Sequence, residues 1–272
     1  MSLILSSRVP GIAGADAQVL RWWRAMCALA AVNVGLWLAV WHFAPVAGFH
    51  GGLQLTLSGV YVLVCAYRSV FPRVDLERLV VVDTRLSNIF LGRAAATVAE
   101  ICFAIQLGLL IHQLGVHAGL PWVQSAAWVV PVFMVVAQGF CWHSVLTLNH
   151  ITQAVESLLW AAGFSWMAVL LGVTALYSTG WVHALAIFGI LGCVAFVVYV
   201  LSVDAPMYWR RYRLGRASGQ TYLCVEQGAR DAWQRRVCSG SWTAWKADAL
   251  WLTPYFSFGV WLSIAMVWVP GR

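Results

Sequence analysis

The sequence contains little charge. Only 10% of its 272 residues are charged, whereas a typical soluble domain has about 25%, and 61% are hydrophobic. The mean hydropathy is +0.77, and apolar runs of roughly 20 residues recur without a heptad or a glycine period. These properties exclude a water-soluble globule, a disordered chain, a collagen and a coiled coil. They indicate a polytopic helical membrane protein.

The sequence also lacks residues and motifs that would indicate a particular activity. Lysine occurs once, as Lys246 before the last apolar run, so the lysine that binds retinal in a rhodopsin has no counterpart. The seven cysteines form no CxxC pair, and most lie inside apolar runs, where cysteine acts as a small hydrophobe. The HExxH zinc signature and the GxSxG nucleophile elbow do not occur. The cofactor is therefore unassigned, and haem or a metal ion stays open.

Seven apolar runs are long enough to cross about 30 Å of hydrocarbon. They are continuously apolar, which favours helices, because a helix satisfies its own backbone in lipid and the strands of a membrane barrel would alternate. We therefore predict an all-α fold with a single seven-helix membrane domain. The predicted helices are 22–44, 52–71, 91–115, 121–142, 157–178, 181–203 and 249–269.

The basic residues predict the orientation. All but Arg272 of the 17 lysines and arginines lie in the N-terminal tail, between the second and third helices, or in 205–248, which is predicted to be a basic cytoplasmic loop. Seven crossings place these three stretches on one side of the membrane, so the positive-inside rule makes the N-terminus cytoplasmic and the C-terminus external. The net charge of +7 would then face anionic lipid, not nucleic acid. The expected location is a plasma membrane or a bacterial inner membrane.

Two acidic residues occur where charge is costly. An ionisable group inside a membrane helix faces a bundle interior or a wet cavity, so each one is a candidate functional group. Glu100 lies seven residues after Arg93, which places it roughly 10 Å inside the membrane from the cytoplasmic end. Glu156 lies in a stretch, 142–157, that contains no Lys or Arg. We expect this stretch to be tucked into the protein, as extended helix ends or as a re-entrant turn.

Helical spacing in this stretch predicts two polar faces. His143 and His150 would share one face, and Asn149, Gln153 and Glu156 would share another. We expect these residues to converge with others at the cytoplasmic end on one pocket. The predicted catalytic residues are Glu100, Glu156, His143 and His150. The predicted substrate-binding residues are Asn149, Gln153, Trp142, Trp160, Asp204 and Arg93.

Three functions are compatible with this pattern. The first is a membrane enzyme that acts on a lipid or isoprenoid-like molecule, with one carboxyl donating a proton, the other accepting one, and aromatic walls stabilising a developing cation. The second is a transporter of a small hydrophobic or protonated solute. The third is a haem-bearing, quinone-bearing or structural subunit of a membrane complex, using the outer-side histidines His42, His50, His112, His117 and His183. The expected partners are membrane lipids, a hydrophobic small molecule, and a partner membrane protein or a second copy of the chain.

Overall fold

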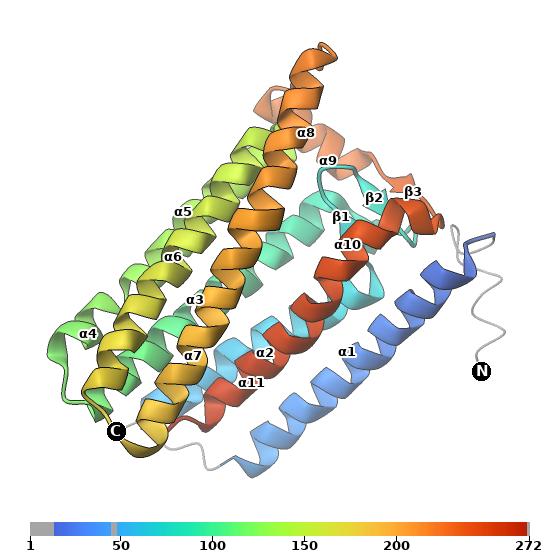
Figure 1. The fold of residues 1–272 in the computed structure, drawn as a ribbon. Coiled ribbons are helices and arrows are strands. Elements are labelled where there is room, and N and C mark those ends of the chain that lie inside the picture. The colour runs from blue at the N-terminus through green and yellow to red at the C-terminus, as the bar shows by residue number, and fades with distance from the viewer. Residues whose placement is uncertain (1–13, 45–47, 271–272) are drawn as a thin grey trace.

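The structure is a computed structural model that describes residues 14–44 and 48–270. Most of the described chain is helical, and seven helical spans are long and apolar enough to cross a membrane, as predicted. The helices lie side by side along one bundle axis (Figure 1). Their bounds are α1 Ala17–Phe43, α2 Gly48–Val70, α3 Ile89–His117, α4 Pro121–Ala126, α5 Val129–Thr147, α6 His150–Leu176, α7 Gly180–Tyr199, α8 Ala205–Ala217, α9 Val225–Gln234, α10 Trp242–Pro254 and α11 Val260–Ala265.

Prolines and short breaks divide three of the spans. α4 and α5 form one span that is interrupted just before Pro131, because proline cannot donate the helical hydrogen bond. α7 continues into α8 through a π-helix, Val200–Asp204, next to Pro206. α10 continues into α11 through a second π-helix, Tyr255–Gly259, which directly follows Pro254. Wide turns of this kind are frequent at functional sites.

The stretch 205–248 differs from the predicted loop. Its first 13 residues extend the sixth span as α8, which projects beyond the bundle in Figure 1, and its last residues begin α10. Between these helices lie α9 and the strand β3, Val237–Cys238. The arginines of α8 are good helix formers, so low hydropathy marks where this helix leaves the apolar layer and not where the helix ends.

A small cap of irregular structure closes the arginine-rich end of the bundle. The strands β1, Arg73–Val74, and β2, Leu79–Val80, form an antiparallel hairpin, and β3 pairs with β2 in parallel. The hairpin turn uses Arg78, whose φ of 56° is unusual for a side chain of this size. Arg78 is almost fully buried and donates to Asp231 of α9, to the Val145 carbonyl of α5 and to the Asp75 carbonyl of the hairpin. One guanidinium thereby ties the cap to the bundle. We call this the cap end.

We expect Gly228→Ala to loosen this cap. A Cβ atom at Gly228 would lie 1.7 Å from the Leu146 carbonyl oxygen of α5, and a backbone atom cannot rotate away. The expected loss is about 1–3 kcal/mol of stability, measured by unfolding in mixed SDS micelles. The matched control is Gly139→Ala in α5, where nothing lies within 4 Å and alanine favours the helix. Equal stability of both variants would contradict the close packing of α9 on α5.

Candidate functional site

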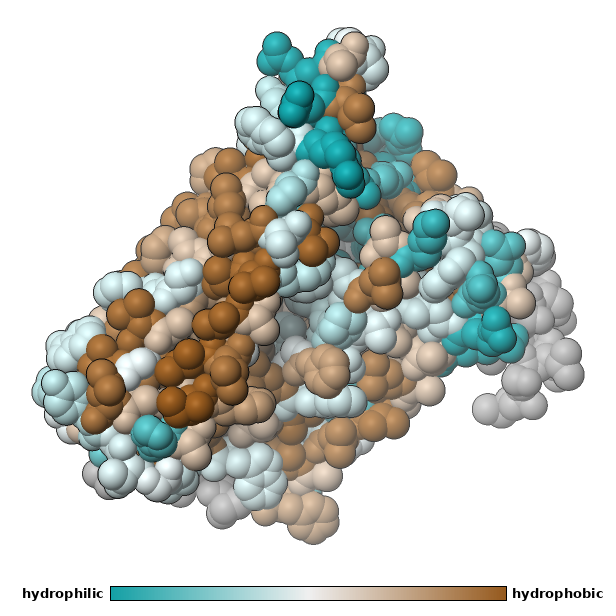
Figure 2. Space-filling view, in the orientation of Figure 1, coloured by the Kyte–Doolittle hydropathy of each residue, from teal (hydrophilic) through white to brown (hydrophobic). Residues whose placement is uncertain are grey.

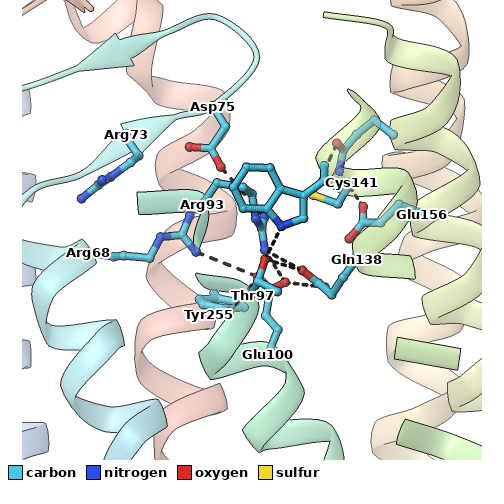
Figure 3. A network of polar contacts seen from close by, with 12 residues as sticks. Arg68, Arg73, Asp75, Arg93, Thr97, Glu100, Gln138, Cys141, Glu156 and Tyr255 are labelled. Atoms are coloured by element: carbon cyan, nitrogen blue, oxygen red, sulfur yellow. Dashed lines mark hydrogen bonds and ion pairs between the residues drawn. The ribbon is translucent and has the colours of Figure 1, made fainter. Parts of the chain in front are cut away.

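The candidate site is a network of buried polar side chains between α2, α3, α5, α6 and the second π-helix, close to the cap end (Figure 3). Glu100 lies at its centre on α3 and is 8% exposed. Its Oε2 accepts from Arg93 Nη2 at 2.5 Å and from Gln138 Nε2 at 2.7 Å. Its Oε1 accepts from the Tyr255 hydroxyl at 3.3 Å and lies 4.0 Å from Arg68 Nη1. Two guanidiniums thus supply counter-charge to this carboxyl.

The cap hairpin contributes further charge. Asp75 lies 3.9 Å from Arg93 Nη1, and the Arg73 guanidinium stacks on the Tyr67 ring at 4.7 Å and donates to the Asn88 carbonyl at 2.7 Å. Arg73 is 2% exposed, and burial lowers the pKa of its guanidinium from the ordinary value. The cap therefore places an acid, Asp75, beside Arg93, and a buried cation, Arg73, against Tyr67 and Asn88.

Glu156 of α6 has a different environment. Its Oε2 accepts from Gln153 Nε2 at 2.5 Å, and its Oε1 accepts from Trp160 Nε1 at 2.9 Å. Both donors are neutral, and within the described chain no basic side chain forms an ion pair with Glu156. A buried carboxyl with neutral partners favours the protonated form, because burial of an uncompensated charge is costly.

Helix α5 connects the two carboxyls. Gln138 contacts Glu100 and Arg93, and one helical turn further on the Cys141 thiol lies 3.9 Å from Gln153 Oε1, next to Glu156. Figure 3 shows Gln138 and Cys141 between the two acids. Glu100 and Glu156, which are 56 positions apart in the sequence, therefore belong to one polar network.

The two π-helices bring two further groups to this network. Tyr255 begins the second one and donates to Glu100. Asp204 ends the first one and accepts from Ser157 at 2.5 Å, directly beside Glu156. Asp204 is thus joined to the α6 side of the site, where the sequence placed it.

Aromatic rings form a continuous row from one carboxyl to the other. Trp160, which donates to Glu156, lies 6.4 Å from Phe196 of α7, and Phe196 lies 6.4 Å from Trp251 of α10. Trp251 lies 6.1 Å from Tyr255, which donates to Glu100.

Two further rings flank this aromatic row. Phe164 packs against Phe196, and Tyr199 stacks on Trp251. In Figure 2 the surface is hollowed between α7 and the α10–α11 span, where the row lies.

Three predicted site residues, His143, His150 and Asn149, lie outside the network. Leu148 adopts a left-handed conformation with φ of 60°, which ends α5 at Thr147, and Asn149 caps α6 by accepting from the Ile151 amide. This break makes the expected common face of His143 and His150 wrong, because the two residues belong to different helices.

The stretch 142–157 is a tight turn between extended helix ends, which is the first of the two predicted alternatives. His143 is exposed and contacts Thr152, and His150 lies near the Tyr208 ring.

The other predicted residues lie at the network. Trp142 donates to Thr97 at 3.0 Å, and Thr97 donates to Gln138. The pair Gln153 and Glu156 is joined as their spacing predicted. The substrate-binding and catalytic roles of these residues stay predictions.

The network's remaining charged and polar members were not predicted from the sequence. Arg68 and Arg73 were interpreted as topology signals, and Asp75, Tyr255 and Cys141 were assigned no role. A signal was present, because the segments FPRVDLER and GRAAATVAEICF mix arginine with acidic residues at the edge of apolar runs. Pro254, inside the last apolar run, marked the turn that carries Tyr255.

Polar residues elsewhere join neighbouring helices. Asn33 donates to the Phe256 carbonyl, and Gln106 contacts Gln54 and Ser263, so both residues join neighbouring helices. Of the outer-side histidines, His112, His117 and His183 contact backbone carbonyls. Over residues 14–44 and 48–270, no group of three or more His, Cys, Asp or Glu side chains is placed to hold a metal ion.

Comparisons with known proteins add no relative. The chain matches no protein family, no curated protein and no solved structure.

Proposed function

We propose that the protein is an integral membrane enzyme that acts on a lipid or isoprenoid-like substrate by acid–base chemistry. The observation that carries this proposal is the aromatic row between two buried carboxyls of opposite character. Glu100 is paired with guanidiniums and serves as the carboxylate, whereas Glu156 has neutral partners and serves as the acid. In enzymes that use two carboxyls, contrasting environments usually make one of them the acid and the other the base.

The chemistry that suits this site begins with protonation of a carbon–carbon double bond. Glu156 gives its proton to one carbon, a C–H bond forms, and the neighbouring carbon becomes a cation that the aromatic row stabilises. Glu100 then removes a proton from a carbon next to the cation, which restores a double bond at a shifted position. A proton beside a carbocation is acidic enough for a carboxylate paired with arginine to accept it. The substrate gains one proton and loses one, so no oxidant is required. The step leaves Glu156 as a carboxylate and Glu100 protonated, and a proton lost from Glu100 to solvent and one taken up by Glu156 from solvent restore the site.

The route of access supports a membrane-dissolved substrate. The aromatic row lies between helices that are largely apolar on their outer surface, as the brown surface over α7 in Figure 2 shows. Trp251 is 39% exposed and Phe196 is half-buried. A hydrophobic chain would therefore pass from the bilayer between α7 and α10 without crossing water.

This proposal is tested by exchange with heavy water. Purified protein is incubated in D₂O with a total lipid extract of its membrane, and the lipids are analysed by mass spectrometry. We expect one lipid class to gain deuterium at carbon, because a protonation and deprotonation cycle exchanges a carbon-bound hydrogen with solvent. Boiled protein is the control. The absence of deuterium from every class would overturn the enzyme proposal and leave the transporter and the cofactor-bearing subunit.

We further propose that the cap end faces the cytoplasm. Within residues 14–44 and 48–270, most arginines lie at this end or in the helices that reach it, and the positive-inside rule assigns such an end to the cytoplasm. The bundle axis in Figure 1 places the end of α11 on the opposite side.

A membrane-impermeant maleimide tests this orientation. Cys224 and Cys238 are exposed at the cap end, so we expect them to react only after the membrane is permeabilised. Thr179→Cys provides the matched control, because Thr179 is exposed in the turn between α6 and α7 at the other end. This variant should react in intact cells. Labelling of Cys224 in intact cells would reverse the proposed orientation.

A further inference from the structure

The buried cluster around Glu100 has an excess of cations. Three guanidiniums, Arg68, Arg73 and Arg93, are at most 9% exposed and lie near only two carboxylates, Asp75 and Glu100. Burial of an uncompensated charge is costly, so a buried cluster of this kind favours a further anion.

The hydrogen-bond inventory shows the same imbalance. Arg68 Nε, Arg73 Nη2 and Arg93 Nε are buried donors without a hydrogen-bond partner in the described chain. Asp75 Oδ1 is the buried acceptor of the cluster that also lacks a partner. Buried donors normally find partners, and three unpartnered N–H groups against one acceptor oxygen match a ligand that is rich in acceptors.

Arg68 is held more weakly than its neighbours. Its described contacts are the 4.0 Å ion pair with Glu100 and a position 5.9 Å from the Phe256 ring centroid. By contrast, Arg93 lies 2.5 Å from Glu100 and also donates to Gln138. In Figure 3 the Arg68 guanidinium points from α2 towards Glu100 and Arg93. It is therefore the side chain that is most available to a ligand.

We infer that Arg68 and Arg93 bind a phosphate group, and that the substrate is a lipid phosphate. The assignment of the lipid phosphate as a substrate rests on the proposed function, whereas the phosphate site rests on the arginines alone. Guanidinium groups bind phosphate oxygens through paired, charge-assisted hydrogen bonds. Tyr255 links this cluster to the aromatic row through its bond to Glu100, so the phosphate lies beside Glu100 and the hydrocarbon chain enters the aromatic row.

The test measures binding without measuring activity. Dioleoyl phosphatidic acid is titrated into the full-length protein in mild detergent, and bound lipid is counted by native mass spectrometry. Dioleoyl phosphatidylcholine is the lipid without a phosphate monoester, and inorganic phosphate is the headgroup alone. The variant is Arg68→Gln, and the matched control is Arg85→Gln, an exposed arginine at the same end.

We expect Arg68→Gln to weaken the binding of phosphatidic acid about 10-fold, because one charge-assisted hydrogen bond is lost. Arg85→Gln should change the binding by less than about 2-fold. If Arg68→Gln does not fold, Arg68→Lys retains the charge but lacks the Nε donor and should still weaken binding. Competition by inorganic phosphate would support the same site with a soluble phosphate as its ligand.

Two results would overturn the phosphate site. One is equal affinity for phosphatidic acid and phosphatidylcholine, and the other is unchanged affinity in folded Arg68 variants. The two proposals fail separately. Arg68-dependent binding without deuterium exchange would remove the enzyme proposal alone, and exchange without Arg68-dependent binding would remove the lipid phosphate alone.

Discussion

Replacement of Glu156 by glutamine should abolish deuterium transfer to lipid while leaving the protein folded. An amide has no acidic proton to donate, so the rate should fall by at least about 100-fold, the usual contribution of a general acid. The fold should survive because glutamine has the same shape. Its carbonyl oxygen still accepts from Trp160 Nε1, and the Gln153 amide can rotate to accept from the new NH₂ group.

The measurement is the initial rate of deuterium incorporation, with folding checked by gel filtration and thermal unfolding. Glu226→Gln is the matched control, because Glu226 is exposed and forms an ion pair with Arg230 outside the network. Its rate should equal that of the unaltered protein. A folded Glu156→Gln protein with a full rate would remove Glu156 from the chemistry.

Replacement of Glu100 by glutamine should damage stability first. The change removes the counter-charge of Arg93, 2.5 Å away, and of Arg68, 4.0 Å away, and leaves two guanidiniums buried. Removal of one partner from a buried ion pair costs about 3–5 kcal/mol. We expect a loss of this size in the free energy of unfolding, measured in mixed SDS micelles.

A second substitution distinguishes charge from shape. Arg93→Met in the Glu100→Gln background removes one of the two stranded cations, the one closest to position 100, and retains most of the side-chain volume. It should recover a large part of the lost stability, since a buried pair replaced as a unit is often close to neutral. If Glu100→Gln alone is as stable as the unaltered protein, Glu100 does not supply the counter-charge in the cluster. The activity of Glu100 variants is therefore informative only beside their stability.

The interior of the bundle was predictable because hydrophobicity and length are local properties. The apolar runs indicated seven spans, and the structure has seven, with the third at Ile89–His117 against a predicted 91–115. Pro131 indicated the break between α4 and α5 for an equally local reason, its missing N–H group. Errors occurred at helix ends, such as α8, where the helix continues into water and hydropathy no longer reports on it.

The role of the arginines was not predictable in the same way. Arg68 and Arg73 were interpreted as topology signals because a basic residue beside an apolar run normally faces solvent. The cap covers them, since Arg78 ties the hairpin to α9 and α5. Burial of this kind depends on contacts between residues more than 60 positions apart, and no local pattern encodes them.

The sequence alone determined that this protein is a bundle of seven membrane-length helices with two acids in costly positions, because hydrophobic length and the cost of buried charge act residue by residue. Only the tertiary structure decided how those acids differ. The packing of α2, α3 and the second π-helix gives Glu100 two cations and a tyrosine, and the packing of α6 gives Glu156 neutral donors. The character of a buried carboxyl depends on its neighbours in space, and those neighbours come from separate parts of the chain.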